Sequence, residues 1–172
     1  MRNRIGMILL AALLLLPACG GGETEQVEGP FLWFCTESER DHGPALSAQP
    51  YEGEMTPEAL LSALLAGPAQ AGLVSPFPRG VTVQSCVLDE ERPGVLLVDL
   101  SEQYGALADV SLTLADYSIV LTLSQLEGVE GVEITAGGRR VSYRSHQLLD
   151  SGEAVLWDEL AEKTLDIPPD SR

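Results

Sequence analysis

Apolar residues along the chain follow two periods, one helical and one extended. The helical period is clearest in residues 56–65, where one face carries four leucines: Leu60, Leu61, Leu64 and Leu65. Thr56 and Pro57 come first, and a hydroxyl followed by a proline is a typical start of a helix. Gly67 and Pro68 follow, and these residue types typically end one. We therefore expect an amphipathic helix whose leucine face packs on a sheet.

A second, longer helix is expected from Thr113 to about Ser124. Thr113 and Asp116 have the spacing of the hydroxyl and the acid in a capping box. The apolar residues that follow form a broad face: Tyr117, Val120, Leu121 and Leu123. This face is wider than a surface helix needs, so we expect the helix to lie at the centre of the core.

Four segments have the pattern of β-strands, namely residues 31–34, 81–87, 95–100 and 132–135. In the second segment the alternation places Val83 and Val87 inward and Cys86 outward. A turn over residues 89–94 makes an antiparallel hairpin of the second and third strands. The pattern predicts an α+β fold, with two helices on one face of a mixed, mainly antiparallel four-stranded sheet, in β-α-β-β-α-β order.

The first eighteen residues have the layout of a signal peptide, with Arg2 and Arg4 ahead of an apolar run from Ile5 to Leu16. The run is shorter than the roughly 20 apolar residues that cross a bilayer. The sequence from Leu16 to Cys19, "LPAC", resembles the lipobox of bacterial lipoproteins. This resemblance implies lipidation of Cys19, cleavage before it, and an extracytoplasmic, membrane-anchored protein. An ordinary signal peptide that holds a cysteine, or an uncleaved membrane helix, are the alternatives.

The rest of the chain suits one domain. We expect a flexible tether over residues 19–29, a domain over residues 30–141 and a C-terminal extension over residues 142–172. The formal net charge of −16 excludes nucleic acid as a partner, because a phosphate backbone attracts positive charge. It favours basic partners or divalent cations.

Two cysteines, Cys35 and Cys86, remain after Cys19. Outside the cytoplasm a disulfide between them is chemically permitted, provided that their strands bring the two α-carbons within about 7 Å. A pair of inert free thiols is the alternative, and the sequence does not decide between the two.

The order of the elements and several local sequences resemble the GerMN domain, a sporulation and spore-germination module of bacterial envelope proteins. Residues 56–68 ("TPEALLSALLAGP"), Pro78 and Gly80, residues 98–101 ("VDLS") and residues 128–139 ("GVEGVEITAGGR") carry the resemblance. It implies an α/β module in a membrane-tethered protein and supplies no catalytic residue. The protein that gives the family its name has two such modules, and this chain has room for one.

Few residues suggest reactive chemistry. His42 and His146, the two histidines, would need nearby carboxylates to hold a metal ion. Ser101 lacks the flanking glycines of a strained nucleophile turn, and the acids at 89–91 fit a solvated hairpin tip. Asp99 ends an apolar strand and fits a carboxylate that accepts hydrogen bonds at the strand exit.

These observations favour binding over catalysis. We expect an anchored docking module for an envelope protein or cell-wall component in sporulation, germination or wall assembly, with no catalytic residue, metal or cofactor. The open sheet face or a sheet edge would meet the partner. A small cell-wall hydrolase or metal-dependent enzyme is the alternative. The sequence leaves the oligomeric state open.

Overall fold

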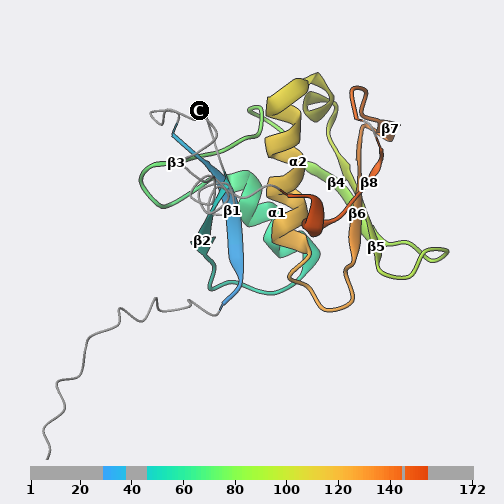
Figure 1. The fold of residues 1–172 in the computed structure, drawn as a ribbon, viewed down its shortest axis with the longest axis horizontal. Coiled ribbons are helices and arrows are strands. Elements are labelled where there is room, and N and C mark those ends of the chain that lie inside the picture. Colours follow the sequence, from blue (N-terminus) through green and yellow to red (C-terminus); the bar gives the residue numbers. More distant parts are fainter. Residues whose placement is uncertain (1–28, 38–45, 145, 155–172) are drawn as a thin grey trace, which may run out of the picture.

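The computed structural model describes residues 29–37, 46–144 and 146–154, and it places two helices between two sheets (Figure 1). The smaller sheet has the order β2-β1-β3, from β1 (Phe31–Thr36), β2 (Leu46–Pro50) and β3 (Leu73–Val74), all antiparallel. The predicted α+β content, the two helices and the mainly antiparallel pairing are confirmed. The predicted count and order of the strands are wrong, because β1 pairs with β2 and β3 in a separate sheet.

The larger sheet has five strands in the described part of the chain. These are β4 (Val83–Leu88), β5 (Val95–Leu100), β6 (Gly131–Ala136), β7 (Arg139–Arg140) and β8 (Leu148–Leu149). The order is β4-β5-β6-β7, and β8 also pairs with β6. Strands β5 and β6 are parallel, whereas the other pairs are antiparallel. The sheet is therefore mixed, and β4 forms one of its edges.

The helices α1 (Pro57–Ala66) and α2 (Asp109–Leu123) fill the space between the sheets. Helix α1 contacts β1 and β4, and α2 contacts β1 and β6. Three of the four leucines of the predicted face of α1, Leu60, Leu61 and Leu64, are 0% exposed, whereas Leu65 is only partly buried. Two short 3₁₀ turns, η1 (Glu102–Ala106) and η2 (Ser151–Glu153), complete the elements.

Helix α2 explains why β1 leaves the larger sheet. The polar residues Ser118 and Thr122 of α2, together with Gln125 just after the helix, bond to the backbone of β1. The Gln125 side chain accepts from Phe31 N at 2.7 Å and donates to Phe31 O at 2.8 Å. The Thr122 hydroxyl accepts from Trp33 N at 3.2 Å. These side chains satisfy backbone groups that a neighbouring strand would otherwise satisfy.

The capping box predicted at Thr113 is absent. Helix α2 begins four residues earlier, at Asp109, after Ala108, which makes no side-chain cap. Thr113 is inside the helix and donates to Asp109 O at 3.2 Å. Asp116 is buried, at 3% exposure, and belongs to the core.

The predicted facing of β4 is wrong in its second half. The register between β4 and β5 shifts between Val83 and Ser85, which is the signature of a β-bulge. Beyond that irregularity Cys86 faces the core at 7% exposure, whereas Val87 is 54% exposed. One extra residue in a strand exchanges the two faces, so a strict alternation cannot locate the core side beyond it.

Part of the expected C-terminal extension packs on the larger sheet. Leu149, in the expected extension, is 4% exposed and belongs to the main core, as does Val141 at the end of the expected domain. Strand β8 pairs with β6 through Val132–Leu149 and Glu133–Leu148. Within the described part of the chain, no helix combines the length and apolar character that crossing a membrane requires.

Candidate functional site

Two of the residues predicted from sequence, the lipidation residue Cys19 and His42, lie outside the described residues. The structure therefore bears on Cys35, Cys86, His146, Ser101, Asp99 and the acids at 89–91.

Cys35 and Cys86 lie in different sheets, and both are free thiols in this structure. Burial raises the pKa of Cys35 to about 11. Burial, together with the negative charge of Glu58, raises the pKa of Cys86 to about 12. Both thiols stay protonated at neutral pH, and a protonated buried thiol is a poor nucleophile and a poor metal ligand.

His146 contacts an acid at the surface. Its Nε2 lies 2.9 Å from Glu153 Oε2, and the Tyr117 hydroxyl donates to the same oxygen at 3.3 Å. The hydrogen bond from His146 holds the pKa of Glu153 below its ordinary value. His146 and Tyr117 border a depression of about 190 Å³ between α2 and the segment that leads to β8. Among the described residues, no group of three or more His, Cys, Asp or Glu side chains is arranged to hold a metal ion.

Asp99 has the structural role that its position suggests. Its Oδ1 accepts from the Thr135 hydroxyl at 2.7 Å and from Gly138 N at 2.8 Å. Gly138 has φ +71, a left-handed conformation that glycine adopts without strain. The carboxylate thus ties β5 to β6 and to the turn after it. Ser101 Oγ accepts from Thr82 N at 3.0 Å and joins the segment that enters β4 to the exit of β5.

Sequence reasoning missed a buried ion pair. Arg144, whose side chain is 3% exposed, donates from Nε to Asp116 Oδ2 at 2.7 Å and from Nη2 to Asp116 Oδ1 at 2.5 Å. The Tyr104 hydroxyl donates to Asp116 Oδ1 at 2.5 Å, and Arg144 Nη1 donates to Ile134 O at 2.6 Å. Burial, and then the negative charge of Asp116, raise the pKa of Tyr104 well above its ordinary value. The three side chains satisfy one another and fasten the segment after β7 to α2.

The helices in the described part of the chain lie on one face of the larger sheet (Figure 1). The residues that point away from the helices form two rows across three strands, and we call this surface the β4–β6 face. Its rows are Val87, Leu97 and Glu133, and Ser85, Asp99 and Thr135. The residues between them in sequence, Cys86, Val98 and Ile134, are buried against the helices. The β4–β6 face is therefore the side of the sheet that the described helices leave open.

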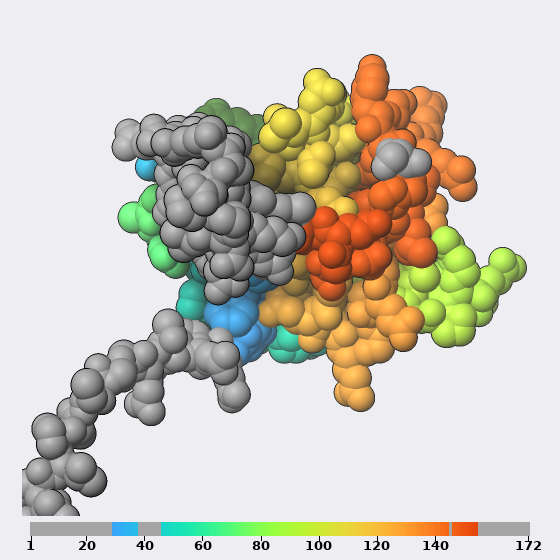
Figure 2. All heavy atoms as spheres, in the orientation of Figure 1, coloured from blue at the N-terminus to red at the C-terminus, as the bar shows by residue number. Residues whose placement is uncertain are grey.

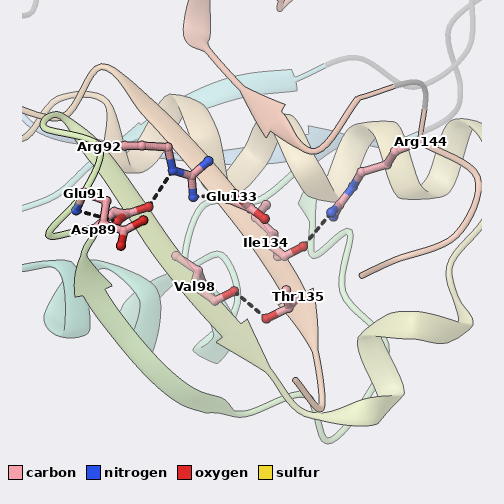
Figure 3. A network of polar contacts seen from close by, with 8 residues as sticks. All are labelled: Asp89, Glu91, Arg92, Val98, Glu133, Ile134, Thr135 and Arg144. Atoms are coloured by element: carbon pink, nitrogen blue, oxygen red, sulfur yellow. Dashed lines mark hydrogen bonds and ion pairs between the residues drawn. The ribbon is translucent and has the colours of Figure 1, made fainter. Parts of the chain in front are cut away.

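Charged side chains border one end of this face (Figure 3). Arg92 Nε donates to Asp89 Oδ2 at 2.5 Å, and its Nη2 donates to Glu133 Oε2 at 2.7 Å. A hydrogen bond from Glu91 N, and then one from Arg92, lower the pKa of Asp89. The two carboxylates raise the pKa of Arg92. Of the acids at the hairpin tip, Asp89 is thus held by Arg92, which also reaches across to Glu133 on β6.

The edge of the face is strand β4, and the tip of its hairpin with β5 projects from the molecule (Figure 2). At this edge Val87 is 54% and Leu88 61% exposed. An open strand edge and an open sheet face are surfaces on which proteins bind extended segments of partners.

Comparison with known proteins agrees with this architecture. The family model described as Germane, sporulation and spore germination, matches residues 34–142. The first GerMN domain of the sporulation protein GerM from Bacillus subtilis is 13% identical, with a TM-score of 0.51, over 74% of this chain and 98% of that domain. The tandem GerMN domains of the same protein are 16% identical, with a TM-score of 0.49.

The match to the tandem structure covers 70% of this chain and 46% of that one, so this chain spans less than half of its length. At these identities the likeness concerns the fold. None of the curated proteins matches the sequence.

Proposed function

This chain belongs to the Germane family of sporulation and spore-germination domains, and from that premise we propose that it is a lipid-anchored envelope protein whose domain docks a partner. The membership confirms the resemblance to the GerMN domain that the sequence indicates. The partner in this proposal is an envelope protein or a cell-wall component, in sporulation, germination or wall assembly.

The β4–β6 face is the single observation that carries the proposal. Leu97 is half-buried and the exposed Val87 adjoins it, so these two residues form an apolar strip on a sheet face that the described helices leave uncovered. Contact with a partner would remove this strip from water, which is favourable by about 25 cal/mol per Å² of apolar surface. Glu133 and Thr135 lie one in each row. Glu133 accepts from Arg92 and Thr135 donates to Asp99, and their oxygen atoms have further lone pairs for donors on the partner.

Binding in place of catalysis is also the simpler assignment for the described side chains. Cys35 and Cys86 are protonated, and Asp116 is fully engaged by Arg144 and Tyr104. His146 has Glu153 as its partner at the surface. These contacts support a module that recognises a partner by its shape and its hydrogen bonds.

The docking surface can be tested with a charge. In the native host, Leu97→Lys should abolish the function of the chain, measured as spore yield, germination rate or wall integrity against a deletion strain. Val110→Lys is the matched control, because Val110 is an exposed apolar residue, 63% exposed, on α2. Both variants should reach wild-type levels in membranes. Full function of the Leu97→Lys chain would overturn the assignment of the face.

The anchor requires its own experiment. Replacement of Cys19 by alanine should move the chain from the membrane fraction to the soluble fraction or leave it as an uncleaved precursor. The physical reason is that acyl chains contribute about 0.8 kcal/mol of membrane affinity per buried methylene. A Cys19→Ala chain of mature size that stays entirely on membranes would contradict lipid anchoring and leave the docking surface untouched.

A further inference from the structure

Strand β4 presents an unpaired edge among the described residues. Asp89 N donates to Val95 O at 2.9 Å, so the backbone of Asp89 points toward β5. Successive residues of an antiparallel strand point their backbone groups in alternate directions. In β4, Val87 therefore also points toward β5, whereas Cys86 and Leu88 direct their N–H and C=O groups outward.

The composition of this edge is unusual for a surface strand. Natural proteins protect open edges with charged residues or prolines. Strand β4, with the sequence VQSCVL, contains neither, although the chain has a formal net charge of −16. Its last two residues, Val87 and Leu88, are 54% and 61% exposed. The unprotected part of the edge is thus apolar as well as unpaired.

We propose that this edge pairs with the same edge of a second copy of the chain, antiparallel, about a two-fold axis at Val87. In this register Cys86 of each copy lies opposite Leu88 of the other, and the two pairs exchange about four backbone hydrogen bonds. Val87 lies opposite Val87 of the second copy in the closely spaced type of pair, with α-carbons about 4.5 Å apart. The two larger sheets then form one continuous sheet, and the exposed apolar residues of the edge are covered. This assembly goes beyond the docking function, which uses the face of the sheet.

The charges at the two ends of β4 favour the antiparallel orientation. Glu90 and Glu91 are exposed and follow the strand, whereas Arg79 is exposed and precedes it. Antiparallel pairing places each acidic tip opposite the uncharged residues 82–85 of the second copy and toward its Arg79. Parallel pairing would bring the two acidic tips together, which costs free energy through repulsion of like charges. A two-fold axis repeats the favourable approach on both sides.

The contact is smaller than a standard interface, which buries roughly 1,600 Å². We therefore expect weak pairing in dilute solution and stronger pairing where the chains are concentrated, as on a surface. The appropriate test is covalent capture of the full chain in intact cells.

A cysteine at the axis captures the pair. The α-carbon separation expected at Val87 is within the range that a disulfide spans. Full-length Val87→Cys should form a disulfide-linked homodimer under mild oxidation, seen by non-reducing electrophoresis and mass spectrometry. The wild-type chain controls for Cys35 and Cys86, which are buried, and Val110→Cys controls for random collision. Dimer in the Val87→Cys chain at no more than the Val110→Cys level, or linkage of it to a different protein, would overturn the proposal.

A charge exchange tests the orientation. Arg79→Glu in the Val87→Cys background should lower the yield of covalent dimer several-fold, because the acidic tip then approaches an acid. Addition of Glu91→Arg should restore the yield, because the approach is again between opposite charges. Equal yields in the three backgrounds would contradict the antiparallel arrangement.

Discussion

At the scale of single residues, the fold is fastened by a buried polar contact that the sequence does not predict, the ion pair of Asp116 and Arg144. Asp116 and Arg144 lie 28 positions apart, and nothing in their local sequence links them. Asp116 resembles the acid of a capping box because only its distance from Thr113 is visible in the sequence. Asp99 is easier to assign, because a lone carboxylate at the end of an apolar strand must accept hydrogen bonds.

The buried ion pair gives a prediction about stability. Arg144→Met should lower the free energy of unfolding by about 3–5 kcal/mol, because it leaves the carboxylate of Asp116 buried without its counter-charge. Addition of Asp116→Asn should recover more than half of this loss, since the amide oxygen still accepts from Tyr104. Arg92→Met is the control and should cost less than about 1 kcal/mol, because the Arg92 side chain is 46% exposed. Urea unfolding measures all three, and equal losses for Arg144→Met and Arg92→Met would contradict this account.

The raised pKa values of Cys35 and Cys86 predict slow alkylation. At pH 8 a thiol with a pKa of about 11 or 12 is almost entirely protonated, whereas an unfolded cysteine, with a pKa of about 8.5, is roughly one-quarter thiolate. We expect iodoacetamide to label both at least about 100-fold more slowly in the native chain than in urea, as measured by peptide mass spectrometry. An introduced Val110→Cys thiol should react quickly and serves as the reference. Rapid labelling of Cys35 or Cys86 in the native chain would contradict this account, because it would show that the thiol is accessible to solvent.

At the scale of the elements, the sequence predicts an element well where its local signals and its burial agree. Helix α1 has a cap, a proline, a leucine face and a glycine end, and the structure has all four. Helix α2 starts at Asp109, and its N-cap residue Ala108 makes no side-chain cap, so no local signal marks its beginning. In β4 the register shift between Val83 and Ser85 exchanges the residues that face the core with those that face outward. No residue type in the sequence marks this shift. The two-residue strands β3, β7 and β8 are too short for a period to appear.

The two helix starts give a matched pair of variants. Thr56 Oγ1 accepts from Ala59 N at 3.3 Å at the start of α1, so Thr56→Ala should lower the free energy of unfolding by about 1 kcal/mol. Thr113→Ala should change it by less than about 0.5 kcal/mol, because Thr113 is exposed inside α2 and alanine favours helix more than threonine. Thermal or urea unfolding measures both. If Thr113→Ala lowered the free energy of unfolding more than Thr56→Ala does, α2 would instead start at Thr113, as the sequence suggests.

At the scale of the whole molecule, the sequence indicates the family and the fold class but not how the layers are divided. Assignment of β1 to a sheet depends on whether Ser118, Thr122 and Gln125 face solvent or its backbone, and periodicity alone does not decide this. The packing of Arg144 and β8 likewise depends on contacts between distant residues. This layering decides which surfaces are available for function, because the helices and the smaller sheet cover one side of the larger sheet. The other side of that sheet and its β4 edge are open among the described residues.

The central claim, that the β4–β6 face docks a partner in the envelope, is tested most directly by photo-crosslinking in living cells of the native host. A photoreactive amino acid at position 97 should give a discrete adduct with an envelope protein or with cell-wall material, identified by mass spectrometry. The same amino acid at position 110 should give none. Absence of an adduct at position 97, or the same adducts at both positions, would contradict the account.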